Sequence, residues 1–139
     1  MYATDLEAAE RFYADVLRLE PFARVTGRHV FFRCGAGVFL VFNPEATSVP
    51  TSGGRPVPLH GARGAGHAAF AVLTAELPPW RERLTRHGVS IEAEVDWPGG
   101  GKSLYVRDPA GNSIELATAA VWGLEESRDE GRGTGDERR

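Results

Sequence analysis

One order of predicted elements occurs twice in this chain of 139 residues, and this repetition limits the fold more than any other feature. The second half predicts a strand over residues 67–73 and then a helix that begins at Pro78 and is capped by Gly88. Three further strands are predicted over residues 89–95, 103–107 and 112–117. The first half predicts a helix ending near Leu17 and three strands, over residues 22–25, 29–33 and 38–42. The repeated unit is therefore βαβββ, and its first copy keeps only residues 1–3 of the opening strand.

Local sequence supports the repeat. Residues 31–33 resemble residues 105–107, and residues 38–40 resemble residues 114–116, which places Phe39 in the position of Glu115. At the start of the first helix, Thr4 and Glu7 have the spacing of a capping box. The predicted organisation is a first module over residues 1–43 and a second module over residues 66–118, joined by a linker over residues 44–65. Residues 119–139 are predicted to form a charged, mobile tail.

Composition excludes several classes of function. The net charge of −3 gives no electrostatic drive toward nucleic acid, and no apolar run approaches the length of a membrane span. No basic and apolar leader precedes the first helix. Cys34 is the only cysteine, so neither an intrachain disulfide nor a multi-cysteine zinc site can form. We therefore expect a cytoplasmic protein.

Strand alternation brings two metal-ligating residue types to one face. His67 and Glu115 both lie on the faces of their strands opposite the bulky apolar side chains, so both would point into a cavity if the sheet curls. Other interpretations remain open. His67 could be a hydrogen-bonded structural residue and not a metal ligand. Arg107 could form a salt bridge that neutralises a buried Glu115. Residues 108–112 have the composition of a turn without any further role. The loop that begins at Trp97 is typical of a flap over a site or of an ordinary surface loop.

Three motifs resemble those of the vicinal oxygen chelate superfamily, which contains glyoxalases, bleomycin-resistance proteins and extradiol dioxygenases. They are the first-helix segment 4–13, the segment 66–72 and the segment 108–116. The resemblance covers about residues 1–118. It implies an α+β fold of two βαβββ modules with curled mixed sheets around a cavity, the first module lacking most of its opening strand.

The resemblance also implies a site. Members that depend on metal place ligands on the first and last strand of each module, which assigns His67 and Glu115 to the metal. The first module departs from this pattern, because Phe39 cannot bind metal and its opening-strand ligand would lie just before Met1. Two ligands argue against a glyoxalase I-like site, which uses four. A histidine upstream of Met1 would complete the two-histidine, one-glutamate set of extradiol dioxygenases, so we expect an upstream start or a strand from a partner.

Three functions remain to be tested. The first is a metal-assisted lyase, isomerase or dioxygenase that uses Fe, Mn, Ni or Zn and acts on a small molecule with neighbouring oxygens. Its expected catalytic residues are Glu115 and Tyr105, and its expected substrate-binding residues are Phe31, Phe39, Val41, Ser113 and Trp97. The second is a metal-free protein that sequesters a small molecule or antibiotic, a cationic drug being attracted by Glu45, Glu92, Glu94 and Asp96. The third, a remnant that binds only a partner protein, is supported by the tail alone. The resemblance further implies a homodimer.

Overall fold

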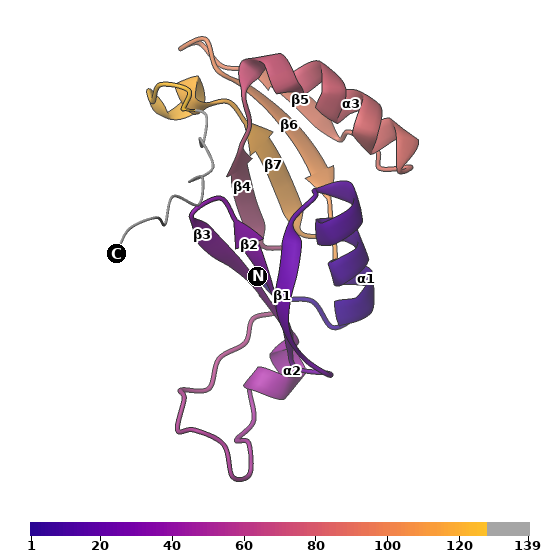
Figure 1. Ribbon diagram of the computed structural model, residues 1–139, viewed down its shortest axis with the longest axis vertical. Coiled ribbons are helices and arrows are strands. Elements are labelled where there is room, and N and C mark those ends of the chain that lie inside the picture. Colours follow the sequence, from indigo (N-terminus) through magenta and orange to yellow (C-terminus); the bar gives the residue numbers. More distant parts are fainter. Residues whose placement is uncertain (128–139) are drawn as a thin grey trace, which may run out of the picture.

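The computed structural model describes residues 1–127, and this part of the chain forms two β-sheets with a few helices beside them (Figure 1). One sheet has three strands in the order β1-β2-β3, and the other has four in the order β4-β7-β6-β5. The predicted α+β class with two sheets is confirmed. Residues 128–139, which belong to the predicted charged tail, lie outside the described residues.

The first half contains the three-stranded antiparallel sheet. Its elements are α1 (Leu6–Arg11), the π-helix η1 (Phe12–Val16), β1 (Glu20–Val25), β2 (His29–Cys34) and β3 (Gly37–Phe42). The predicted capping box at Thr4 is wrong. Asp5 is the N-cap, because its carboxylate accepts a hydrogen bond of 3.0 Å from the backbone N–H of Ala8. The helix stops at Arg18, whose φ of 62° is left-handed and cannot continue a right-handed helix.

The opening strand of the first half is reduced to a few backbone contacts, as the sequence predicts. Tyr2 forms a single parallel bridge with Phe42. The amino group of Met1 donates to the carbonyl oxygen of Leu40 at 3.0 Å, and the N–H of Ala3 donates to the carbonyl oxygen of Phe42 at 2.9 Å. Residues 1–3 therefore extend the first sheet beside β3.

The second half contains the four-stranded mixed sheet. Its elements are β4 (His67–Ala71), the 3₁₀ turn η2 (Thr74–Glu76), α3 (Leu77–Arg86), β5 (Ala93–Asp96), β6 (Lys102–Arg107) and β7 (Ser113–Ala117). Strand β4 pairs with β7 in parallel, and β7 pairs with β6 in antiparallel orientation. The predicted strand over residues 89–95 begins later, because the N–H of Val89 bonds to the carbonyl oxygen of Leu84 and closes α3.

The segment between the two halves projects away from both sheets (Figure 1). It is not entirely loop, because it begins with the short helix α2 (Pro44–Thr47), which is capped by the Asn43 side chain. After β7 the chain forms the 3₁₀ turn η3 (Ala119–Trp122), which ends at Gly123 in a left-handed conformation. Among the described residues, no helix has the length and apolar character needed to span a membrane.

The two halves share one hydrophobic core. Helix α1 packs on β2 and β3, and α3 lies along the second sheet (Figure 1). Phe39 joins the halves, because its ring centroid lies 4.8 Å from that of Tyr13 and 5.1 Å from that of Phe70. Arg83 on α3 donates from Nε to the carbonyl oxygen of Val16 at 2.8 Å. The core therefore fixes the two sheets relative to each other.

Candidate functional site

The second sheet brings the two predicted metal ligands together on the face away from α3. His67 begins β4 and Glu115 lies in the middle of β7, where its neighbours across the ladders are Ala69 and Tyr105. Because side chains alternate along a strand, His67, Ser103, Tyr105 and Glu115 all lie on this face, which we call the open face of the second sheet. The Nε2 atom of His67 lies 3.1 Å from Oε2 of Glu115.

Burial differs sharply between these two side chains. The Glu115 side chain is 9% exposed, whereas that of His67 is 50% exposed. A buried carboxylate is costly unless charged or hydrogen-bonding groups compensate for its lost hydration. Arg107, the expected neutralising partner, does not supply this compensation, because its Nε donates to Oε2 of Glu92 at 2.6 Å. Among the described residues, His67 is the only basic side chain paired with Glu115.

The other oxygen of Glu115 is held by a residue that the sequence did not single out. Ser103 Oγ donates to Oε1 of Glu115 at 2.6 Å, and Trp97 Nε1 donates to Ser103 Oγ at 2.9 Å. Ser103 is 1% exposed. The signal that could have found it is the strand period, since Ser103 and Tyr105 are two residues apart and share a face. Trp97, which is expected to contact substrate, is connected to Glu115 through Ser103.

Tyr105 and Ser113 flank the pair as predicted from the strand phase. The Tyr105 ring stacks beside the His67 imidazole, with centroids 6.3 Å apart and planes inclined by 26°. Desolvation, followed by the neighbouring Glu115 carboxylate, raises the pKa of Tyr105, so its hydroxyl stays protonated at neutral pH. Ser113 lies directly across the ladder from His67.

The expected apolar wall of Phe31, Phe39 and Val41 does not exist as one surface. Phe31 pairs with Leu40, so Phe31 and Leu40 share one face of the first sheet, while Phe39 and Val41 alternate onto the other. Val41 is fully buried and Phe39 packs in the core. Of the three, only Phe31 lies on the face away from the core, where its ring stacks on His29 at a centroid separation of 4.0 Å.

The pairing registers also correct the relation between the two modules. Phe31, which corresponds to Tyr105, pairs with Leu40, and Tyr105 pairs with Glu115. Leu40, rather than Phe39, therefore occupies the position of Glu115. The error came from matching the hairpins by local similarity, and a shift of one residue exchanges the two faces of a strand. Leucine, like phenylalanine, has no side-chain donor for a metal ion, so the first module still lacks this ligand.

The turn between β6 and β7 carries two buried polar side chains that bond to distant parts of the chain. Asp108 and Asn112 are 4% and 2% exposed, and Tyr13 donates from its hydroxyl to Oδ2 of Asp108 at 2.6 Å. Asn112 donates from Nδ2 to the same oxygen and to the carbonyl oxygen of Tyr2, and its Oδ1 accepts from the N–H of Gly66 at 2.8 Å. This cluster joins both halves and fixes the backbone immediately before His67. The turn pattern did not predict this cluster, because it gives no information on the burial of Asp108 and Asn112.

The donor set fits two positions around a divalent metal ion. Metal–donor bonds of about 2.1 Å that meet at a right angle separate their donor atoms by about 3 Å, close to the His67–Glu115 spacing. A catalytic metal usually has three protein ligands. Within residues 1–127, however, no group of three or more His, Cys, Asp or Glu side chains could hold a metal ion. His67 and Glu115 would therefore need a donor from another source.

The four acidic residues expected to attract a cationic drug are all paired. Glu92 contacts Arg107, Glu94 contacts Arg81, Asp96 contacts Lys102, and Glu45 lies 3.8 Å from Arg63. These contacts neutralise the charges that would have formed an acidic surface. The argument for attraction of a cationic drug by these four residues is therefore weakened.

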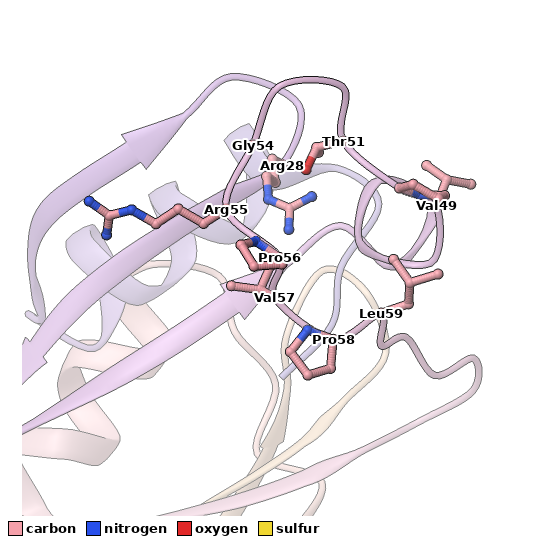
Figure 2. Close-up of a pocket in the computed structure, with 10 residues that line it drawn as sticks. Arg28, Val49, Thr51, Gly54, Arg55, Pro56, Val57, Pro58 and Leu59 are labelled. Atoms are coloured by element: carbon pink, nitrogen blue, oxygen red, sulfur yellow. The ribbon is translucent and has the colours of Figure 1, made fainter.

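Two concavities lie elsewhere. A groove of about 1010 Å³ runs between the halves beside Phe70, Leu116 and Trp122. A smaller cavity of about 280 Å³ lies within the projecting segment (Figure 2). Figure 2 shows the Arg28 guanidinium inside this loop, while Arg55 points away, and Arg28 donates to the carbonyl oxygen of Ala46 at 3.0 Å. Neither concavity is lined by His67 or Glu115.

Comparison with known proteins supports the two-sheet fold. The family described as the Glyoxalase/Bleomycin resistance protein/Dioxygenase superfamily matches residues 1–116. A solved structure of a lactoylglutathione lyase from Agrobacterium tumefaciens is 42% identical, with a TM-score of 0.84 over 89% of this chain and 92% of that chain. Biphenyl-2,3-diol 1,2-dioxygenase 3 from Rhodococcus globerulus is 31% identical over 93% of this chain. This chain spans 65% of that relative's length. A glyoxalase/bleomycin resistance protein/dioxygenase from Nocardioides is 22% identical, with a TM-score of 0.65 over 85% of this chain and 78% of that chain, a likeness of fold alone.

Proposed function

Because the chain belongs to the glyoxalase/bleomycin resistance protein/dioxygenase superfamily, we propose that it acts on a small molecule with neighbouring oxygen atoms, with the help of a divalent metal ion. His67 and Glu115 would hold the metal, and the reaction would be of the lyase, isomerase or dioxygenase type. The observation that carries this proposal is the buried carboxylate of Glu115, which has a half-exposed imidazole beside it and no arginine or lysine partner among the described residues.

The residues around the pair suit the binding of an oxygen-bearing ligand. A bound metal ion would supply Lewis acidity, which stabilises negative charge on a ligand oxygen. His67 reaches the solvent-accessible side of the open face, so a ligand can approach it, whereas Glu115 is shielded. The protonated hydroxyl of Tyr105 can donate a hydrogen bond to a ligand oxygen. These roles for Glu115 and Tyr105 remain those expected from the sequence.

The names of the relatives are compatible with this class of ligand. Biphenyl-2,3-diol carries two neighbouring hydroxyl oxygens, and the Rhodococcus relative is named as a dioxygenase that acts on it. The Agrobacterium structure is named as a lactoylglutathione lyase. Both names point to small-molecule chemistry and differ in reaction type, so we extend only the class of small oxygen-bearing molecules to this chain.

A second candidate is a protein that binds a small molecule without metal or catalysis. The observation that favours it is the small number of metal ligands. The position in the first module that corresponds to Glu115 is occupied by Leu40, which cannot bind metal. Under this alternative, the hydrogen-bonded pair of His67 and Glu115 would recognise polar groups of the ligand directly. Metal content separates the two candidates.

The test is elemental analysis of the full chain, purified without chelator and without metal-affinity steps, and again after reconstitution with Fe²⁺, Mn²⁺, Ni²⁺ or Zn²⁺. We expect near-stoichiometric metal, which the double variant His67→Ala/Glu115→Ala loses. The matched control is His87→Ala/Glu92→Ala, which removes the same residue types from exposed positions and should keep the metal. Absence of metal from the unaltered protein after reconstitution would reject the enzyme proposal and leave the metal-free candidate.

A homodimer is the assembly that we expect, because a second copy of the chain is one source of the missing donor. Light scattering of the eluted protein at micromolar concentration should give twice the mass of the chain. If the protein elutes as a monomer that still holds metal, the third donor must come from elsewhere.

A further inference from the structure

The glycine-rich segment after β5 is tied to the candidate site by a chain of hydrogen bonds. Trp97 begins this segment and donates to Ser103 Oγ at 2.9 Å, and Ser103 donates to Glu115 Oε1 at 2.6 Å. Glu115 Oε2 then lies 3.1 Å from His67 Nε2. The sequence predicts either a flap or an ordinary surface loop for residues 97–101. Neither prediction includes the hydrogen bonds that connect this segment to Glu115.

The chemistry of the donors fixes the direction of the first two hydrogen bonds, from Trp97 to Ser103 and from Ser103 to Glu115. An indole nitrogen can only donate, so Ser103 Oγ must accept from Trp97. The single hydroxyl hydrogen of Ser103 is then directed to Glu115, and Oε1 must act as an acceptor. The second oxygen, Oε2, is left facing His67 and the open side of the sheet.

The segment itself is held in place from its other end. The N–H of Trp97 bonds to the carbonyl oxygen of Gly101 at 2.8 Å, which closes residues 97–101 into a compact turn. A side-chain carbon at Gly101 would lie 2.4 Å from the backbone nitrogen of Val121, so the turn packs tightly on η3. The indole is therefore presented to Ser103 by a backbone that η3 supports.

We infer that Ser103 and Trp97 are positioning residues for Glu115, and that they couple the glycine-rich turn to a cation bound by that carboxylate. The coupling to a cation rests on the proposed function, whereas the positioning of Glu115 does not. Removing a residue that orients a metal ligand typically lowers metal affinity about 10–100-fold. Ser103 contacts Glu115 directly and should have the larger effect, and Trp97 acts through Ser103.

The first measurement follows the relay without any metal. In nuclear magnetic resonance spectra of the full chain, the Trp97 indole N–H signal should shift in Ser103→Ala and in Glu115→Gln, although the indole N–H donates to Ser103 and not to Glu115. The shift is expected because a charged acceptor polarises each hydrogen bond in a chain. The matched control is Glu92→Gln, which removes a paired carboxylate elsewhere and should leave this signal in place.

The second measurement is the calorimetric affinity for Mn²⁺. We expect Ser103→Ala to bind Mn²⁺ about 10–100-fold more weakly, and Trp97→Phe to show a smaller loss of up to about 10-fold. Ser103→Thr keeps the hydroxyl and should restore affinity, which a purely structural role for a buried small residue would not predict. Trp122→Phe changes an exposed tryptophan outside the relay and should bind like the unaltered chain.

The two measurements separate the possible failures. If the indole signal moves in Glu115→Gln but the unaltered chain binds no Mn²⁺, the relay stands and the metal proposal fails. If the signal stays in place in both Ser103→Ala and Glu115→Gln, the relay is overturned whatever the metal result. Unchanged Mn²⁺ affinity in both Ser103→Ala and Trp97→Phe would overturn the coupling to the cation.

Discussion

Replacement of Asp108 with alanine should destabilise the protein by about 3–5 kcal/mol, because it removes one member of a fully buried polar cluster. The carboxylate accepts hydrogen bonds from the Tyr13 hydroxyl, from the Asn112 side chain, and from the backbone N–H groups of Ala110 and Asn112. Burial, followed by the hydrogen bond and charge of Asp108, raises the pKa of Tyr13, so its hydroxyl is a donor at any physiological pH. Without Asp108 that donor is buried and unpaired.

Urea denaturation monitored by circular dichroism gives the free energy of unfolding. The matched control is Tyr13→Phe, which removes a single hydroxyl, keeps the other donors to Asp108, and should cost about 1–2 kcal/mol. The thermal midpoint of Asp108→Ala should fall by about 10 °C or more. Equal losses for the two variants would mean that only the Tyr13 hydrogen bond matters and that the rest of the cluster contributes nothing.

Replacement of Phe39 with alanine should cost about 2–4 kcal/mol, because the ring packs between Tyr13 of the first half and Phe70 of the second. The cavity left behind would lie where the two halves meet, so the contact between them should weaken most. Unfolding followed by urea denaturation measures the loss, and the steepness of the transition reports whether the halves still unfold together.

The neighbouring variant Phe31→Ala distinguishes this result from the original expectation for the site. Phe31 lies on the opposite face of the first sheet, so its replacement should lower the free energy of unfolding clearly less than that of Phe39. If Phe39→Ala proved nearly neutral for stability while weakening ligand binding, Phe39 would line a cavity, and its assignment to the core would be wrong.

Strand alternation placed His67 and Glu115 on the faces of their strands opposite the bulky side chains, and the family resemblance assigned both residues to one site. They are 48 residues apart in the sequence, and the structure brings their side chains to 3.1 Å. The period of two carries this information locally. The α+β class and the reduced opening strand followed from the same pattern.

The remaining features depend on register and on long-range contacts. Phe39 and Val41 were assigned to the wrong face, because the pairing of β2 with β3 had to be inferred from similarity, and an error of one residue reverses the face. The roles of Asp108 and Trp97 come from partners distant in the sequence or fixed by a loop conformation. No local pattern encodes the acceptor that an indole or a tyrosine hydroxyl will find.

The parallel pairing of β4 with β7 has a consequence for any measurement of affinity. These strands are the first and last of their module, so the rest of the module forms the loop that must close when His67 and Glu115 meet. Closing so long a segment is entropically costly. A module in which β4 and β7 are not paired does not bring His67 and Glu115 together. The apparent dissociation constant of a ligand at this pair is the intrinsic constant divided by the folded fraction of the module. Affinities of destabilised variants therefore report on chemistry only after the folded fraction has been measured at the same temperature.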